Sequence, residues 1–267
     1  MSLEERDLSF LDHPDFVRFI FYPRRHHGAL RETDDTFSLS IPISDGINIV
    51  GRFYRTNNFK LAPTILFFHG NGEIATDYDF IGPTYQQMGI NLFVADYRGY
   101  GQSDGHPSFS NMIKDAHMIY QGLRTYLLEN QFSGSVSVMG RSLGSASAIE
   151  IATHYQNQLA CLIIESGFAY TYNLLRRLGI PSNLLPPEKE EIASNLPSIR
   201  KIKIPSLFIH GENDMIIPLD DGVSLHKNVA SENKNILIVP RAGHNDLLLL
   251  APDDYMEAIR KIINDTS

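Results

Sequence analysis

Residues 136–149 read Val-Ser-Val-Met-Gly-Arg-Ser-Leu-Gly-Ser-Ala-Ser-Ala-Ile, and the five from Gly140 to Gly144 match the pattern G-x-S-x-G. The residues before this motif are typical of a strand, and the small and apolar residues after it are typical of a helix. A sharp turn between a strand and a helix is the setting that presents a serine as a nucleophile. We therefore predict Ser142 as the nucleophile. The structural alternative is a helix start bracketed by glycines.

Two backbone amides are candidates for binding a negatively charged oxygen in a reaction of Ser142. The amide of Leu143 lies at a helix start, where N–H groups have no partner within the helix. The second donor is expected from the loop His69-Gly70-Asn71-Gly72, because glycines let a backbone approach a substrate closely. We choose the amide of Asn71, with Gly72 as the fallback. A plain glycine-rich turn is the alternative interpretation.

A serine needs a base to take its proton, and position in the chain favours His244 among ten histidines. His244 follows the last expected strand and precedes the last expected helix, so its loop leaves the same edge of the sheet as the turn at Ser142. His210 and His69 each precede a glycine, and we interpret them as residues that shape their own loops. The other candidates are expected at surface-like positions: His106, His117, His154 and His226.

The acid that orients the base is expected between the serine and the histidine in chain order. The loop after the strand at 206–209 offers Glu212 and Asp214. We prefer Asp214 because it is the shorter acid within the loop, whereas Glu212 lies too near the strand end. Glu165, which follows the preceding strand, stays open as an alternative. The acid fixes the tautomer of the imidazole and stabilises its charged form without accepting a proton.

Outward from the motif, strands and helices alternate along the chain. Asp45-Gly46 lies between two extended segments within 37–54 and predicts a hairpin. The further expected strands cover 64–68, 91–95, 135–139, 159–164, 206–209 and 235–239. Helices are expected at 78–88, 110–129, from 143, at 220–229 and at 252–263. This alternation predicts a mostly parallel central sheet with helices on both faces.

One segment, at about 168–202, interrupts the alternation with leucines and a Pro-Pro pair. We expect it to form a short cap or lid over the edge that carries the motif, because long excursions at such edges are often functional. A crossover helix with a proline-rich loop is the alternative. The whole chain, 1–267, is expected to form a single domain.

Composition excludes several classes of protein. A net charge of -8 argues against nucleic-acid binding, and we expect the short basic cluster at 24–27 to be solvated. The single Cys161 excludes an intrachain disulfide and a multi-cysteine metal site. No apolar signal core follows the charged N-terminus, and no run of 18 apolar residues occurs. We therefore expect a soluble, cytoplasmic protein that needs no metal or cofactor for its reaction.

Taken together, five motifs resemble the α/β-hydrolase superfamily. More narrowly, they are similar to its branch of serine hydrolases that includes the depalmitoylating α/β-hydrolase-domain proteins. The motifs are His69 to Gly72, Asp96 to Ser103, Gly140 to Gly144, Asp214 in its loop, and Gly243 to Asp246. The resemblance implies a triad of Ser142, Asp214 and His244, and a structural role for the Arg-Gly-Tyr-Gly loop. It also implies hydrolysis of an ester or thioester of a small-molecule acyl substrate.

Three other functions are compatible with parts of the sequence. An amide- or peptide-cleaving hydrolase would use the same three side chains. A non-catalytic relative would use the fold only for binding. Residues 70–75 also match G-x-G-x-x-A, with Asp96 about twenty residues on, which is the fingerprint of a dinucleotide-binding oxidoreductase. That fingerprint normally opens its fold, whereas two extended segments precede it here.

Overall fold

Eight strands form one sheet in the order β1-β2-β4-β3-β5-β6-β7-β8 in the computed structural model, which describes residues 7–266. The strands are β1 (Thr36–Pro42), β2 (Asn48–Tyr54), β3 (Thr64–Phe68), β4 (Asn91–Ala95), β5 (Val136–Arg141), β6 (Leu162–Glu165), β7 (Ser206–Gly211) and β8 (Lys234–Val239). The strands from β4 to β8 in that order pair in parallel, whereas β1 and β2 are antiparallel to their neighbours. The expected mostly parallel sheet with helices on both faces is confirmed.

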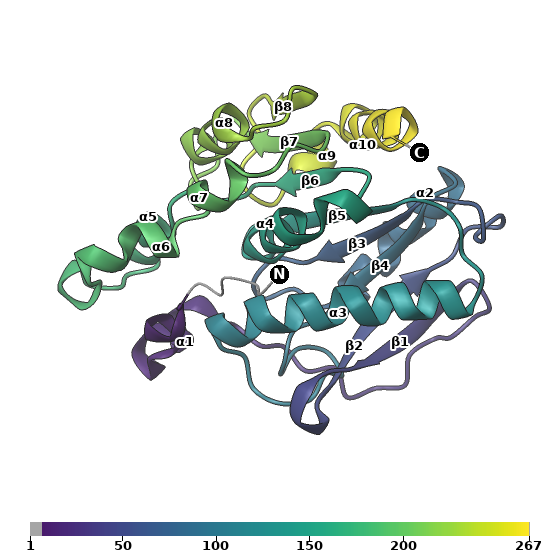
Figure 1. Ribbon diagram of the computed structural model, residues 1–267, viewed down its shortest axis with the longest axis horizontal. Helices are drawn as coiled ribbons and strands as arrows, with labels where there is room; N and C mark the ends of the chain where they lie inside the picture. The colour runs from purple at the N-terminus through teal and green to yellow at the C-terminus, as the bar shows by residue number, and fades with distance from the viewer. Residues whose placement is uncertain (1–6, 267) are drawn as a thin grey trace.

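Helices connect the strands and cover both faces of the sheet (Figure 1). The α-helices are α1 (Pro14–Ile20), α2 (Gly82–Gln87), α3 (Phe109–Glu129), α4 (Gly144–Tyr155), α5 (Thr171–Arg177), α6 (Glu190–Ala193), α7 (Leu196–Ile199), α8 (Leu219–Asn228), α9 (Leu247–Leu250) and α10 (Pro252–Thr266). The 3-10 helices are η1 (Ser9–Asp12), η2 (Ser44–Gly46), η3 (Ala75–Phe80), η4 (Gln156–Gln158), η5 (Ser182–Leu184) and η6 (Pro187–Lys189).

The first two strands form the expected hairpin, with Ile41 opposite Ile49 and the turn at η2. The helix expected at 78–88 is instead two short helices, η3 and α2. Pro83 contributes to the break, because a proline has no N–H to donate to the carbonyl oxygen four residues earlier, at Asp79. Proline is tolerated in the first turn of a helix, and α2 accordingly begins at this point.

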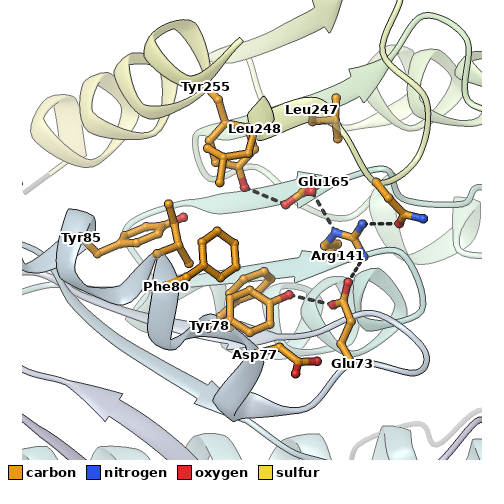
Figure 2. Close-up of a pocket in the computed structure, with 13 residues that line it drawn as sticks. Glu73, Asp77, Tyr78, Phe80, Tyr85, Arg141, Glu165, Leu247, Leu248 and Tyr255 are labelled. Atoms are coloured by element: carbon orange, nitrogen blue, oxygen red, sulfur yellow. Dashed lines mark hydrogen bonds and ion pairs between the residues drawn. The ribbon is translucent and has the colours of Figure 1, made fainter. Parts of the chain in front are cut away.

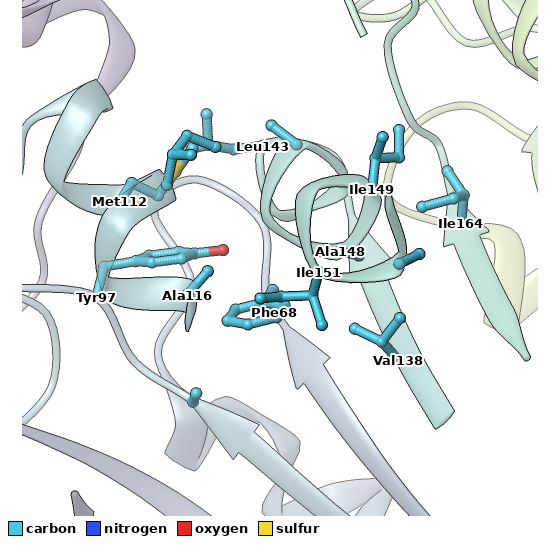
Figure 3. Packing of buried hydrophobic residues seen from close by; sticks show 14 of the residues in the cluster. Phe68, Tyr97, Met112, Ala116, Val138, Leu143, Ala148, Ile149, Ile151 and Ile164 are labelled. Atoms are coloured by element: carbon cyan, nitrogen blue, oxygen red, sulfur yellow. The ribbon is translucent and has the colours of Figure 1, made fainter. Parts of the chain in front are cut away.

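The core lies in two layers, one on each face of the sheet, because successive side chains of a strand point to opposite faces. In β3, Leu66 and Phe68 belong to the layer under α3 and α4, whereas Ile65 and Phe67 belong to the layer under α2 and α10. Figure 3 shows the first layer, where side chains of three neighbouring strands lie against α4; those labelled are Phe68, Val138 and Ile164. The nucleophile motif is thereby anchored between a buried strand and a buried helix.

The glycines of the motif are required by close packing. A Cβ atom at Gly140 would collide with the carbonyl oxygen of Gly144, and one at Gly144 would collide with that of Phe68. Any side chain at either position would push α4 away from β3 and β5. The sequence therefore uses glycine where the helix crosses the sheet edge closely.

The segment 168–202 contains five short helices from α5 to α7, and part of it projects beyond the sheet beside α1 (Figure 1). The ring of Phe10 contacts that of Tyr172 edge-on, with centroids 6.4 Å apart. Within residues 7–266, no helix combines the length and the apolar character that crossing a membrane requires. Most of the charged N-terminus on which the signal-peptide expectation rests, residues 1–6, lies outside the described residues.

Substitution of Gly144 by alanine is predicted to destabilise the protein by about 2 kcal/mol or more, because the new methyl group meets the backbone of β3. Urea unfolding measures the change. Ser147→Ala on the same helix is the matched control. Its buried hydroxyl has no hydrogen-bond partner among the described residues, so its loss is expected to be neutral or stabilising. Equal destabilisation by both variants would contradict this interpretation of the motif.

Candidate active site

Ser142 lies at the sharp turn between β5 and α4, with a backbone φ of 50°. This left-handed conformation is strained for a residue other than glycine and is a recurrent feature of functional sites. The amide of Ser142 donates a 2.9 Å hydrogen bond to the carbonyl oxygen of Glu165, which fixes the turn against β6. The side chain is buried, with 8% of the residue exposed.

The structure brings Ser142, His244 and Asp214 together, although they are far apart in the sequence. Nε2 of His244 is 2.9 Å from Oγ of Ser142, and Nδ1 of His244 is 2.7 Å from Oδ2 of Asp214. Strands β5, β7 and β8 are parallel, so the loops that follow them leave one edge of the sheet. The three residues lie on these loops. Their hydrogen bonds form the arrangement in which a carboxylate orients an imidazole toward a hydroxyl.

Asp214 is held as a carboxylate. Burial by itself would raise the pKa of Asp214, but the hydrogen bond and charge of His244 and the amide of Ile217 lower it below its ordinary value. Oδ1 of Asp214 also accepts hydrogen bonds from the amides of Ile216 at 2.9 Å and Ile217 at 2.8 Å. One oxygen is thus fixed by the backbone while the other faces the imidazole.

The two other candidate acids, Glu165 and Glu212, form hydrogen bonds with other groups. Oε1 of Glu165 pairs with Nε of Arg141 at 3.0 Å, and Oε2 accepts from the hydroxyl of Tyr255 at 2.7 Å. Glu212 accepts a hydrogen bond from the amide of Arg241 at 2.8 Å. Within residues 7–266, neither carboxylate contacts the imidazole of His244.

The competing histidines near the sheet edge have structural partners. His69 contacts the carbonyl oxygen of Gly70 at 2.8 Å and Asp96 at 3.1 Å, so it braces its loop. Asp96 is almost fully buried and also accepts from the amide of Ala75 at 2.8 Å. It is therefore committed inside the protein and is not available to bind a ribose. His210 contacts the carbonyl oxygen of Ile217 at 2.8 Å.

Both amides chosen for the oxyanion hole lie at one cavity with Ser142 and His244. Asn71 and Leu143 line this cavity, and within residues 7–266 neither of their amides donates to another backbone group. The side-chain oxygen of Asn71 accepts from the amide of Tyr22 at 2.9 Å and the hydroxyl of Tyr100 at 2.8 Å. These bonds hold the loop, so the backbone of Asn71 is positioned by its own side chain. The role of the two amides stays a prediction.

The cavity has a volume of about 360 Å³, and both polar and apolar side chains line it. Its apolar lining comes from α1, the start of α3, α5 with its last turn, and the loop after β7: Ile20, Phe109, Leu174, Leu175, Leu178 and Ile216. The volume lies near the lower end of the range for small-molecule sites, about 300–1,000 Å³. The arrangement offers a reactive hydroxyl beside space for an apolar group.

Arg141, directly before Ser142, joins the loops around the cavity, and Figure 2 shows its contacts with Glu73 and Glu165. Its guanidinium donates to Glu165 at 3.0 Å, to the carbonyl oxygen of His244 at 3.0 Å and to Oδ1 of Asn245 at 2.8 Å, and it also pairs with Glu73. Burial by itself would lower the pKa of Arg141, but the two carboxylates raise it above its ordinary value. A permanent charge therefore lies beneath the site.

The same residues form a wall between two cavities. A second cavity of about 310 Å³ lies on the far side of Glu73, Arg141 and Asn245, all three of which also line the first. Figure 2 shows aromatic side chains around it, including Tyr78, Phe80, Tyr85 and Tyr255. The hydroxyl of Tyr78, which lines the second cavity, donates a 2.8 Å hydrogen bond to Glu73. The carboxylate of Glu73 therefore has this hydrogen bond beside its ion pair with Arg141.

Comparisons with known proteins agree with this fold. A sequence profile for the family described as serine aminopeptidase, S33, matches residues 60–183. Protein bem46 of Schizosaccharomyces pombe is 31% identical over 202 residues, which are 74% of this chain and 66%, slightly less than two thirds, of that protein. An uncharacterized membrane protein of Saccharomyces cerevisiae is 28% identical over 91% of this chain and 87% of its own length.

Among solved structures, an esterase of Pyrococcus furiosus superposes with a TM-score of 0.74 at 17% identity, covering 91% of this chain and 98% of that one. This likeness concerns the fold. The sequence and structure comparisons support membership of the α/β-hydrolase superfamily. Together, the comparisons support a hydrolase of the α/β fold.

Sequence reasoning missed the residues of this protein that connect different elements. Arg141 occupies a variable position of the motif, and nothing local indicates that it would pair with Glu73 and Glu165. Ile20 and Phe109 carry no chemical signal, and they reach the cavity only through the packing of α1 and α3. Arg24, expected to be solvated, is exposed but also donates to the carbonyl oxygen of Gly72 at 3.0 Å.

Three of the histidines expected at surface-like positions, His117, His154 and His226, are half-buried. The side chains of His117 and His154 are 15% and 19% exposed, because α3 and α4 pack against each other where these residues lie. The expectation failed because neither helix by itself indicates which of its polar residues meets a neighbour. His106 is exposed, as expected.

Arg141→Met is predicted to destabilise the hydrolase by about 3–5 kcal/mol, because it leaves a buried carboxylate without its partner. Urea unfolding measures the loss. Arg141→Met combined with Glu165→Gln is expected to recover part of it. Arg260→Met breaks an exposed ion pair with Glu257 and is the control, with an expected change of about 1 kcal/mol or less. A wild-type unfolding midpoint for Arg141→Met would contradict the prediction.

The stability of the protein is predicted to depend on pH through the carboxyl group of Glu73. Burial would raise the pKa of Glu73, but Arg141 and its other partners lower it below the ordinary 4.5. Folding thus favours the charged carboxylate of Glu73, which stabilises the folded protein. This contribution to stability is complete above pH 4.5, the ordinary pKa of the group. It is lost as the pH falls through the lower pKa that Glu73 has in the folded state. The melting-temperature gap between wild type and Glu73→Gln is expected to narrow in acid. A gap that widens below pH 4.5 would refute this.

Proposed function

We propose that the protein is a serine hydrolase that cleaves a carboxylic ester or thioester through an acyl-enzyme. The observation that supports this most is the unbroken chain of hydrogen bonds from Asp214 through His244 to Ser142 at the cavity. A serine hydroxyl is a weak nucleophile, and an adjacent oriented base is the feature that activates it.

In the first step, Oγ of Ser142 attacks the substrate carbonyl while Nε2 of His244 takes its proton. The carbonyl π electrons move to the oxygen, and the amides of Leu143 and Asn71 stabilise that oxyanion. The oxyanion then collapses, and His244 returns the proton to the departing alcohol or thiol. Asp214 stabilises the imidazolium throughout.

Water completes the reaction by the same route. His244 takes a proton from a water molecule, whose oxygen attacks the acyl carbon bound to Ser142. Collapse of the second tetrahedral intermediate releases the carboxylic acid, and His244 returns the proton to Ser142. None of these steps requires a metal or a cofactor.

The apolar lining of the cavity favours an acyl group as the substrate portion bound there. Burial of such a group contributes about 0.8 kcal/mol per CH₂. Leu174, Leu175 and Leu178 come from the segment 168–202, and we therefore propose that this segment acts as a cap over the acyl chain within a single domain. The size of the cavity favours acyl chains of modest length.

Ser142→Ala is predicted to lower kcat for ester hydrolysis about a million-fold, and to abolish labelling by a fluorophosphonate probe, because the nucleophile is lost. Ser147→Ala, on the same helix, is the control that keeps both. If Ser142→Ala retained a tenth of the turnover, the assignment of the nucleophile would be wrong.

Asp214→Asn is predicted to lower kcat about ten-thousand-fold, because the amide fails to hold the reactive tautomer of His244. Glu212→Gln in the same loop is the matched control and is expected to retain activity near that of the wild type. Equal losses in the two variants would contradict the assignment of the acid.

A second candidate function is cleavage of an amide at the N-terminus of a peptide. The description of the matching family, serine aminopeptidase, favours it. Assays with esters of increasing acyl length, one thioester and one aminoacyl amide, all on the same preparation, separate the two. A kcat/KM for the amide above that of every ester would favour the peptidase.

A further inference from the structure

Two histidines and a glutamate converge between α3 and α4, outside the site described above. Nε2 of His117 on α3 is 3.3 Å from Oε1 of Glu150 on α4, and Nδ1 of His154 is 3.1 Å from the same oxygen. Glu150 and His154 are four residues apart and therefore lie on one face of α4. Glu150 is only 5% exposed.

Two of the three distances between these donor atoms are close to those of a metal site. With bonds of about 2.0–2.1 Å in a tetrahedral zinc site, neighbouring donor atoms lie about 3.3–3.4 Å apart. The two contacts with Glu150 are 3.3 and 3.1 Å, and all three donor atoms lie within 4.8 Å of one another. A small expansion of the cluster would admit an ion.

The orientation of His117 is fixed by a second contact. Its Nδ1 lies 3.2 Å from the hydroxyl of Tyr155, which leaves Nε2 directed at Glu150. Metal-bound histidines commonly donate their other ring N–H to such a partner. Nδ1 of His154 also lies 2.9 Å from the carbonyl oxygen of Glu150, so metal binding requires its proton on Nε2 and a slight turn of the ring.

We propose that His117, Glu150 and His154 bind a divalent transition-metal ion, with Zn²⁺ as the best match. Two imidazoles and one carboxylate suit zinc, whereas Mg²⁺ and Ca²⁺ prefer oxygen donors alone. Water would fill the fourth position. His154 is about 15 Å along α4 from Gly144 at 1.5 Å per residue, so the ion is remote from the hydroxyl of Ser142. It acts as a clamp that joins α3 to α4.

The full-length protein is freed of metal with a chelator and then dialysed against Zn²⁺, after which its metal content and melting temperature are measured. We expect one zinc ion per chain and a raised melting temperature. His117→Ala and His154→Ala, which are half-buried and should fold, each lose both effects. Tyr155→Phe is expected to weaken zinc binding about tenfold or more. Replacing zinc by Co²⁺ should give the strong visible absorption of tetrahedral coordination.

Two controls make the result specific. His106→Ala removes an exposed histidine and should bind zinc like the wild type. His244→Ala removes a histidine of the candidate active site and should also retain the zinc and the melting shift. Loss of zinc in His244→Ala, unchanged binding in His117→Ala, or a wild type that binds no zinc would each overturn the proposal. In the last case the cluster is an ion pair between imidazole and carboxylate.

Discussion

The buried guanidinium of Arg141 is the interaction on which the arrangement of the site depends. It lies one residue before Ser142 and holds the loop of His244, the end of β6 and the loop that carries Asn71. A buried charge is costly unless every partner is in place. The network therefore forms completely or not at all, and this condition fixes the three loops relative to one another. The contact between the imidazole of His244 and the hydroxyl of Ser142 depends on this placement of the loops.

Sheet topology supplies the second constraint. Parallel strands deliver all of their following loops to one edge, so residues from β5, β7 and β8 meet although the chain between them is long. Helix α4 connects this edge to the opposite side of the molecule. Its start is held by Gly144 against β3, and its last two turns carry Glu150 and His154 against α3. Both ends of α4 are thus in contact with a neighbouring element, β3 at the start and α3 near the end.

The parts of the site that could be predicted from the sequence are those with local signals. Ser142 has glycines that a tight turn requires, and His244 and Asp214 occupy loops whose positions follow from counting strands. The ion pairs of Arg141 with Glu73 and Glu165 have no such signal, because these residues lie at the ends of β5 and β6 and in the loop after β3, far apart in the sequence. The split of the helix at Pro83 was readable in principle, since proline lacks the N–H of a helical hydrogen bond and is favoured in the first turn of a helix.

The sequence by itself determined the alternation of strands and helices, the turn at Ser142 and the chain order of the three reactive side chains. These depend on hydrophobic periodicity and on glycine and proline, which act within a few residues. Only the tertiary structure decided which carboxylate meets His244, which apolar side chains line the cavity, and that His117 meets Glu150. Such contacts join residues whose separation in the chain carries no information about distance, because they are set by how whole helices and strands pack.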